Sequence, residues 1–216
     1  MCYRRPVKIV VSDVGLGNLR SVERALLRAA EMAERDAEIV VTRDPDGVRR
    51  ADKVVVPGQG AFRDCTAALA GGMGDAVREA IVRGVPYFGI CLGLQVLFER
   101  SAEAEGCAGL GVLRGTVERL AGGVDELTGG ALKVPHTGWN HAMPTRTSLL
   151  PDVPTWFYFV HSYAVVPADA SIVAANTHYG TSFVSAVAKD NVFACQFHPE
   201  KSQTAGLSLL ARFLKG

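Results

Sequence analysis

A cysteine between two glycines is the residue of this sequence best suited to covalent chemistry. Residues 86–95 read Pro-Tyr-Phe-Gly-Ile-Cys-Leu-Gly-Leu-Gln, an apolar strand pattern followed by a Gly-x-Cys-x-Gly turn and helix-forming residues. The glycines let the chain turn sharply from strand to helix, so we expect the Cys91 thiol to stand exposed above a sheet edge. N–H groups at a helix N-terminus favour the thiolate, which is the nucleophile. A buried cysteine that only packs is the alternative.

The C-terminal part of the chain supplies an imidazole and a carboxylate that such a cysteine would need. Residues 193–200 read Phe-Ala-Cys-Gln-Phe-His-Pro-Glu. Pro199 favours an extended His198, and residues two apart in an extended chain project to the same side, so His198 and Glu200 can share one site. The carboxylate can orient the imidazole, which can move a proton from the thiol to a leaving amine. A solvated turn is the alternative, but the combination with an elbow cysteine favours catalysis.

A glycine-rich turn could complete this site. Residues 53–56 are typical of a buried parallel strand, and a Pro-Gly-Gln-Gly turn follows them. Backbone N–H groups in such a turn can hold a developing oxyanion. The expected donors lie near Gly58, Gln59 and Gly60, with the N–H of Leu92 as the second donor. An ordinary strand-to-helix turn remains an alternative.

The elements that must position these residues alternate in the first half of the chain. Strands are expected at 8–12, 38–42, 53–56 and 87–90, and helices after the capping residue Asn18 and at 75–83. After residue 106, short β-branched or aromatic segments follow at 115–119, 131–134, 155–161, 171–177, 183–189 and 192–196, and a helix at 204–215. The pattern predicts one α/β domain over residues 1–216. Its mostly parallel central sheet is flanked by helices and carries a smaller mixed or antiparallel β extension.

Composition narrows the function classes. A chain of 216 residues with a formal charge of +1 can bury a core and offers no basic patch for nucleic acid. The longest apolar stretch is broken by proline and glycine and is shorter than the ~20 residues of a membrane helix. No zinc-ligand spacing is present, so no metal is expected. The five cysteines lack regular spacing and a secretory leader, which predicts a reducing cytoplasm. They are Cys2, Cys65, Cys91, Cys107 and Cys195.

The three motifs occur in an order that identifies a family resemblance. Pro-Gly-x-Gly, then Gly-Ile-Cys-Leu-Gly-x-Gln, then Gln-Phe-His-Pro-Glu resembles the class I (triad) glutamine amidotransferases. Segments 13–22, 135–140 and 158–163 look like those of the glutaminase subunit of imidazole glycerol phosphate synthase, and the resemblance spans nearly the whole chain. Two departures concern the partner face and the oxyanion strand. Val14 stands where the family often has tyrosine, and Gln59 where valine is frequent.

The resemblance implies a flavodoxin-like core and a glutaminase with the triad Cys91, His198 and Glu200. It implies hydrolysis of L-glutamine through a cysteine thioester, without a cofactor, in a cytoplasmic heterodimer. A barrel-shaped cyclase subunit would receive the ammonia through a shielded passage and form imidazole glycerol phosphate and an aminoimidazole carboxamide ribotide in histidine biosynthesis. Two alternatives stay open. The chain could serve anthranilate, guanylate or pyridoxal phosphate synthesis, or be a non-catalytic regulatory subunit of the same fold.

Other residues are assigned with the help of the resemblance. Gln95 lies one helical turn beyond Cys91 and is expected to reach the substrate, with polar packing as the alternative. The segment His161, Ser162 and Tyr163 is expected to present backbone groups to the α-amino and carboxylate groups of glutamine, with packing at the core edge as the alternative. The expected partner-facing residues are Asn18, Arg20, His136, Trp139 and Asn140; Trp139 is large and amphipathic enough to anchor an interface.

Overall fold

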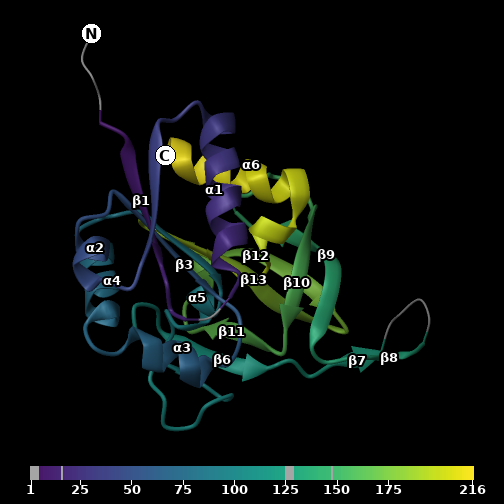
Figure 1. Cartoon of the computed structure of the whole chain (residues 1–216). Coiled ribbons are helices and arrows are strands. Elements are labelled where there is room, and N and C mark those ends of the chain that lie inside the picture. The colour runs from purple at the N-terminus through teal and green to yellow at the C-terminus, as the bar shows by residue number, and fades with distance from the viewer. Residues whose placement is uncertain (1–4, 16, 125–128, 147) are drawn as a thin grey trace.

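Five parallel strands form the centre of the fold in the computed structural model, which describes residues 5–15, 17–124, 129–146 and 148–216 (Figure 1). They are β1 (Val7–Ser12), β2 (Ala37–Thr42), β3 (Lys53–Gly58), β4 (Tyr87–Cys91) and β14 (Val192–Cys195). Their spatial order is β2-β1-β3-β4-β14, and each neighbouring pair is parallel. This is the 2-1-3-4-5 order of flavodoxin-like sheets, which confirms the predicted core. Cys2, one of the five cysteines, and Leu16, in the segment 13–22, lie outside the described residues.

Helices cover both faces of this sheet. Helices α1 (Leu19–Ala33) and α6 (Gln203–Lys215) lie together on one face, and α3 (Phe62–Leu69) and α4 (Met73–Val82) lie on the other (Figure 1). Side chains alternate along each strand, so Ile9 and Phe88 pack towards α1 and α6, whereas Val10 and Tyr87 pack towards α3 and α4. The strands β3, β4 and β14 are therefore buried on both sides, which explains their continuous apolar runs.

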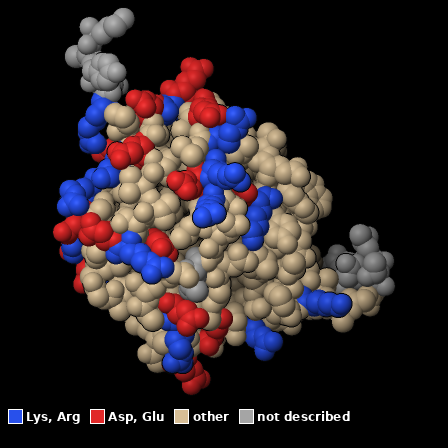
Figure 2. Space-filling model, viewed as in Figure 1, with Lys and Arg blue, Asp and Glu red and all other residues tan. Residues whose placement is uncertain are grey.

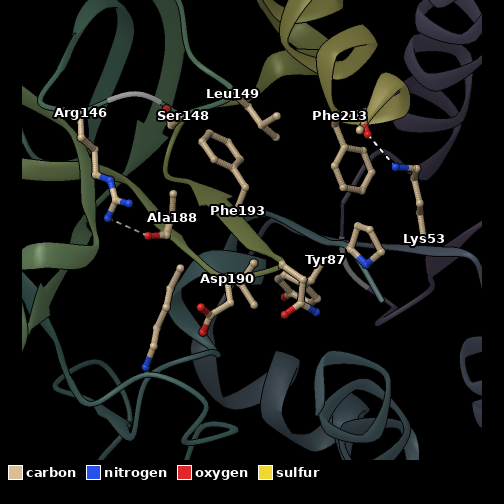
Figure 3. Close-up of a pocket in the computed structure, with 14 residues that line it drawn as sticks. Lys53, Tyr87, Arg146, Ser148, Leu149, Ala188, Asp190, Phe193 and Phe213 are labelled. Atoms are coloured by element: carbon tan, nitrogen blue, oxygen red, sulfur yellow. Dashed lines mark hydrogen bonds between the residues drawn. The ribbon is translucent and has the colours of Figure 1, made fainter. Parts of the chain in front are cut away.

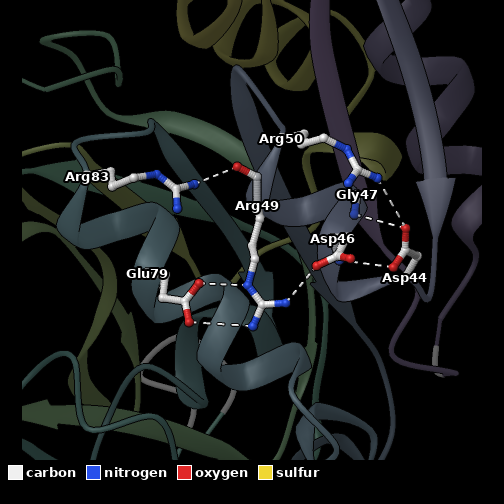
Figure 4. A network of polar contacts seen from close by, with 7 residues as sticks. All are labelled: Asp44, Asp46, Gly47, Arg49, Arg50, Glu79 and Arg83. Carbon is white, nitrogen blue, oxygen red and sulfur yellow. Dashed lines mark hydrogen bonds and ion pairs between the residues drawn. The ribbon is translucent and has the colours of Figure 1, made fainter.

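A surface network ties α2 (Pro45–Arg49) to α4 (Figure 4). Arg49 donates to Glu79 at 2.7 Å and to Asp46 at 2.9 Å, and Arg83 donates to the Arg49 carbonyl oxygen at 2.7 Å. The Asp44 side chain accepts from the first backbone N–H groups of α2. Exposed ion pairs contribute little individually, so this network mainly fixes how the two helices meet.

The second half of the chain extends the sheet with antiparallel strands. Beyond β14 the order continues β13-β12-β9-β10, and β11 pairs with both β13 and β6. These strands are β6 (Gly115–Arg119), β9 (His136–Pro144), β10 (Thr155–His161), β11 (Tyr163–Pro167), β12 (Val173–Tyr179) and β13 (Thr181–Lys189). The shorter elements are α5 (Leu92–Gln95), β5 (Arg100–Ser101), β7 (Gly123–Val124), β8 (Ala131–Leu132), and the 3₁₀ turns η1 (Ala170–Ile172) and η2 (Pro199–Lys201). The predicted antiparallel extension is confirmed.

The strand β9 is the largest element that the sequence did not predict. It pairs with β10 from His136 to Ala142 and continues to the edge of β12. Gly138 and Pro144 are unfavourable in strands and weaken the sequence pattern, so tertiary pairing decides this segment. The predicted strand 131–134 is shorter in the structure, where β8 ends at Leu132.

The surface carries both signs of charge in close alternation. Figure 2 shows Lys and Arg interspersed with Asp and Glu over the helical side, and few charged side chains over β9 and β10. Within the described ranges, no helix is long and apolar enough to cross a membrane.

A cavity of about 320 Å³ opens where β3, β4 and β14 begin (Figure 3). The buried Lys53 there donates from Nζ to the Phe213 carbonyl oxygen at 2.9 Å, so it neutralises the C-terminal end of α6. Burial lowers the pKa of Lys53. The cavity lies at the amino ends of the strands, opposite the edge where ligands bind in such sheets.

Candidate active site

The carboxyl ends of the central strands bring the three sequence motifs together. Gly58, the last residue of β3, pairs with Cys91, the last residue of β4, and Cys195 at the end of β14 pairs with Ile90. His198 follows three residues after Cys195. Because parallel strands end at the same edge of a sheet, residues far apart in sequence meet there.

The backbone at Cys91 has the geometry of a nucleophile elbow. Its φ and ψ are 54° and −102°, an unfavourable conformation for a residue with a side chain. A Cβ on Gly93 would overlap the Val56 carbonyl oxygen, and one on Gly89 would lie 2.5 Å from the Gly93 oxygen. The hydroxyl of the buried Tyr87 donates to the same oxygen at 2.7 Å. Both glycines are therefore required for the turn, as the sequence predicted.

One expectation about Cys91 was wrong and another was confirmed. The residue is 5% exposed rather than open to solvent, and the side chain of Gln196, just beyond the end of β14, lies against its sulfur. Cys91 lies at the N-terminus of a helix, as predicted, and this helix, α5, is a single turn that ends at Gln95.

His198 and Glu200 form a buried pair. His198 Nδ1 lies 2.7 Å from Glu200 Oε1, and both side chains are almost fully buried. The backbone fixes the imidazole, since His198 N donates to the Tyr158 oxygen at 2.8 Å and Ser202 Oγ donates to the His198 oxygen at 2.6 Å. Nε2 has no hydrogen-bond partner among the described residues, which leaves it available for a reacting group.

The pKa of His198 is raised to about 9 by competing effects. Burial alone lowers the pKa, but the side chains of Cys91 and Glu200 outweigh it because both favour the imidazolium. His198 therefore holds its proton at neutral pH.

The other described buried thiols are in surroundings that disfavour ionisation. Burial, with a smaller effect of Cys91, raises the pKa of Cys65 to about 12. Burial likewise raises the pKa of Cys195, whose sulfur lies 3.4 Å from the Phe197 oxygen. Within the described chain, no three or more His, Cys, Asp or Glu side chains are grouped to hold a metal ion.

The glycine-rich turn lies directly beside the elbow. A Cβ on Gly58 would be 2.6 Å from the Leu92 Cβ, so only glycine lets β3 approach α5 this closely. Gly60 has a φ of 138°, a conformation that favours glycine. Gln59 Oε1 accepts from Lys201 Nζ at 3.2 Å, so the residue that departs from the family pattern contacts the residue that follows the His-Pro-Glu segment.

The candidate substrate residues already bond to one another. Gln95 Nε2 donates to the Tyr163 oxygen at 3.0 Å and to Gln196 Oε1 at 3.1 Å. His161 Nδ1 lies 2.9 Å from the same Tyr163 oxygen, and the Ser162 oxygen accepts from Leu120 N. Gln95 therefore has the polar packing of the alternative interpretation. Contact of residues 95 and 161–163 with substrate stays a prediction.

The candidate partner residues divide into exposed and buried ones. Asn18 and Arg20 are exposed, Trp139 is 44% exposed, and Asn140 is half-buried. His136 is only 2% exposed and stacks on the Phe159 and Tyr179 rings, so its expected place on the partner-facing surface was wrong. Side chains alternate along β9, which turns His136 inward while Trp139 faces out.

Val14 is also buried, at 1% exposure, so its departure from the family pattern lies in the core and not on the partner face.

Sequence reasoning missed Gln196, whose Nε2 donates to Cys91 Sγ at 3.5 Å. The alternation that placed His198 beside Glu200 would also have placed residue 196 on that side of the chain.

Comparisons with known proteins identify the family of this chain. Residues 11–216 match the family model described as "Glutamine amidotransferase class-I". The imidazole glycerol phosphate synthase subunit HisH of Methylococcus capsulatus is 46% identical over 96% of this chain and 95% of its own length. The chain belongs to the class I glutamine amidotransferases. Within these amidotransferases it is similar to HisH subunits: that of Nitrosomonas europaea is 48% identical over 96% of this chain and 97% of its own length.

Solved structures support the amidotransferase fold. A glutamine amidotransferase crystal structure has a TM-score of 0.70 and 22% identity, covering 97% of each chain. The glutaminase domain of Trypanosoma brucei CTPS with bound acivicin has a TM-score of 0.65 and 19% identity, covering 97% of this chain and 94% of that one.

Proposed function

We propose that residues 1–216 form one glutaminase domain that hydrolyses L-glutamine and delivers ammonia to the cyclase subunit of imidazole glycerol phosphate synthase. The observation that carries this proposal is the convergence of Cys91, on a strained elbow, with the buried pair of His198 and Glu200. Similarity to HisH subunits over nearly the whole chain supports the partner and the role in histidine biosynthesis. Such a pair would work in the cytoplasm as a heterodimer.

The first half-reaction forms a thioester. The Cys91 thiolate attacks the carboxamide carbon of glutamine, and backbone N–H groups near Gly58–Gly60 and of Leu92 hold the oxyanion. The carbon–nitrogen bond then breaks, and His198 Nε2 donates a proton to the departing ammonia. The raised His198 pKa, to which the Cys91 side chain contributes, supports this role.

The second half-reaction hydrolyses the thioester. His198 Nε2, now without its extra proton, accepts a proton from water as the oxygen attacks the acyl carbon. The carbon–sulfur bond breaks, glutamate leaves, and Cys91 returns to the thiolate. Glu200 keeps Nδ1 protonated and the ring in place throughout, as its 2.7 Å contact allows.

A continuous surface beside the site fits a protein partner. A Cβ placed on Gly17 would lie 3.4 Å from the backbone N of Gln59, and the Gln59 side chain contacts Lys201. The Lys201 Nζ lies 5.8 Å from the centre of the Tyr158 ring. The Tyr158 ring in turn packs edge-on against Trp139, with 6.1 Å between the ring centres. These contacts connect the glycine-rich turn to the aromatic face of β9 and β10.

This aromatic face is suited to docking. Trp156 is 53% exposed, and a hollow of about 420 Å³ lies beside Trp139 and Asn140. Aromatic residues with few charges are typical of interface centres. Docking here would cover the site and keep ammonia from becoming ammonium, which lacks the reactive lone pair.

The experiment is to measure glutamate release by the chain alone, with the cyclase subunit, and with cyclase plus its nucleotide substrate. We expect the rate to rise at each step, because a partner that favours the oxyanion-binding arrangement raises turnover. Equal rates in the three mixtures would contradict the coupling. Co-purification with an anthranilate, guanylate or pyridoxal phosphate synthase instead would assign another pathway. Partner binding without any glutamate release would indicate a regulatory subunit.

A further inference from the structure

Gln196 lies between the nucleophile and the core of the extension. Its side chain is fully buried, its Nε2 donates to Cys91 Sγ at 3.5 Å, and its backbone N donates to the Ser185 oxygen at 2.9 Å. A buried carboxamide could be placed here for packing alone. A neutral N–H aimed at a sulfur that must carry negative charge is also a thiolate donor, and such a bond is strong where water is excluded.

Gln95 fixes which end of this carboxamide meets the sulfur. Gln95 Nε2 donates one hydrogen to the Tyr163 oxygen and the other to Gln196 Oε1. The oxygen end of Gln196 is thereby occupied, so its NH₂ end faces Cys91. A flipped Gln196 would place two N–H groups against each other and an oxygen against the thiolate.

Two imidazoles extend this hydrogen-bonded network beyond the Tyr163 oxygen. His161 Nδ1 faces the Tyr163 oxygen and must donate, so its Nε2 accepts from His136 Nδ1 at 3.1 Å. His136 Nε2 then accepts from Asn140 Nδ2 at 3.3 Å. Burial lowers the pKa of His161 to about 3 and that of His136 to about 4. Both rings are therefore neutral at pH 7, which leaves one assignment of hydrogens along the chain.

We propose that Gln196 is a further catalytic residue, whose carboxamide N–H stabilises the Cys91 thiolate at rest and when the sulfur leaves the thioester. Gln95 is the positioning residue that keeps this N–H directed at the sulfur. The proposal rests on the proposed glutaminase function but concerns a property of Cys91 that exists without substrate. The titratable groups around Cys91 are His198 with Glu200, Cys65 and Cys195; the substitutions below leave them in place.

The test is the pH dependence of Cys91 alkylation by iodoacetamide in the isolated chain, measured by mass spectrometry of the Cys91 peptide. Gln196→Met keeps the length of the side chain and removes the donor. We expect the alkylation rate at neutral pH to fall about tenfold, because the sulfur loses a hydrogen-bond donor to its charged form. Gln95→Met should move it in the same direction by less. The matched control is Ser185→Ala on the adjoining strand β13. It removes a buried hydroxyl that has no hydrogen-bond partner among the described residues, and it should leave the alkylation of Cys91 unchanged.

An unchanged alkylation profile in folded Gln196→Met would overturn the proposal. If circular dichroism shows that this variant does not fold, Gln95→Met decides, and an unshifted profile there would overturn it equally. Alkylation needs neither glutamine nor cyclase, so the two proposals fail separately. A shifted profile in a chain that never releases glutamate would contradict only the glutaminase function.

Discussion

Gly58 on β3 and Leu92 on α5 approach so closely that a Cβ on Gly58 would lie 2.6 Å from the Leu92 Cβ. Both residues belong to the proposed oxyanion site, so the distance between strand and elbow sets how the two N–H donors face the substrate. We expect Gly58→Ala to lower glutamine turnover about 10²–10³-fold, as loss of one donor does. Synthesis from free ammonia by the complex is the control. If that activity falls equally, the substitution disrupts folding or assembly instead.

A second prediction separates the roles of His198 and Glu200. His198→Ala should cost more glutamine-dependent turnover than Glu200→Gln, because the imidazole transfers protons and the carboxylate orients it.

Glu200→Gln should also change the pH profile. The interaction with Glu200 is one cause of the raised His198 pKa, so its loss should move the alkaline limb down from about pH 9. Initial rates from pH 6 to 10 measure both effects, and a Glu200→Gln limb that stays in place would contradict the pairing.

The sequence predicted this triad because its geometry is local. Glycines around Cys91 permit one kind of turn, and alternation around Pro199 places His198 and Glu200 on one side. The parallel core followed from runs of apolar residues separated by helical patterns, and its flavodoxin-like order came from the family resemblance.

The parts that the sequence missed depend on tertiary contacts. Strand β9 pairs with β10 and β12, and the sulfur of the buried Cys91 contacts a side chain more than a hundred residues away. The contacts of Gln196 and the inward turn of His136 were missed for the same reason, since their partners lie on other helices and strands.

A third prediction concerns acid stability. His136 and His161 have lowered pKa values in the folded chain, so the unfolded chain takes up protons from about pH 6.5 downward that the folded chain does not. The folded state therefore has the full stability that these two histidines allow above pH 6.5, and it loses stability as the pH falls towards 4, the pKa of His136, and 3, the pKa of His161. His161→Gln keeps a donor and an acceptor without titrating. Between pH 7 and pH 5 the free energy of unfolding should fall in both proteins, and the fall should be about 2 kcal/mol smaller in His161→Gln than in wild type.

Urea unfolding at the two pH values measures this difference. The control is Ser185→Ala, which removes a buried hydroxyl and no titratable group and should keep the wild-type pH dependence. Equal losses in wild type and His161→Gln would show that His161 does not resist protonation.

A fourth prediction tests the aromatic face. Trp139→Ala should weaken cyclase binding by tenfold or more, because exposed tryptophans near the centre of an interface contribute strongly. Val82→Ala on α4, which removes an exposed apolar side chain from the helical layer, should leave the affinity unchanged. Titration calorimetry gives both constants. Equal affinities for the two variants would place the partner elsewhere on the chain.

The role of Cys91 in glutamine hydrolysis is tested most directly by glutamate release from the complete complex carrying Cys91→Ala, with the cyclase subunit and its nucleotide substrate present. The sulfur is the only atom proposed to form the acyl bond, so we expect glutamate release to fall to background while synthesis from free ammonia continues. Glutamate production at the wild-type rate by this variant would contradict the thioester mechanism.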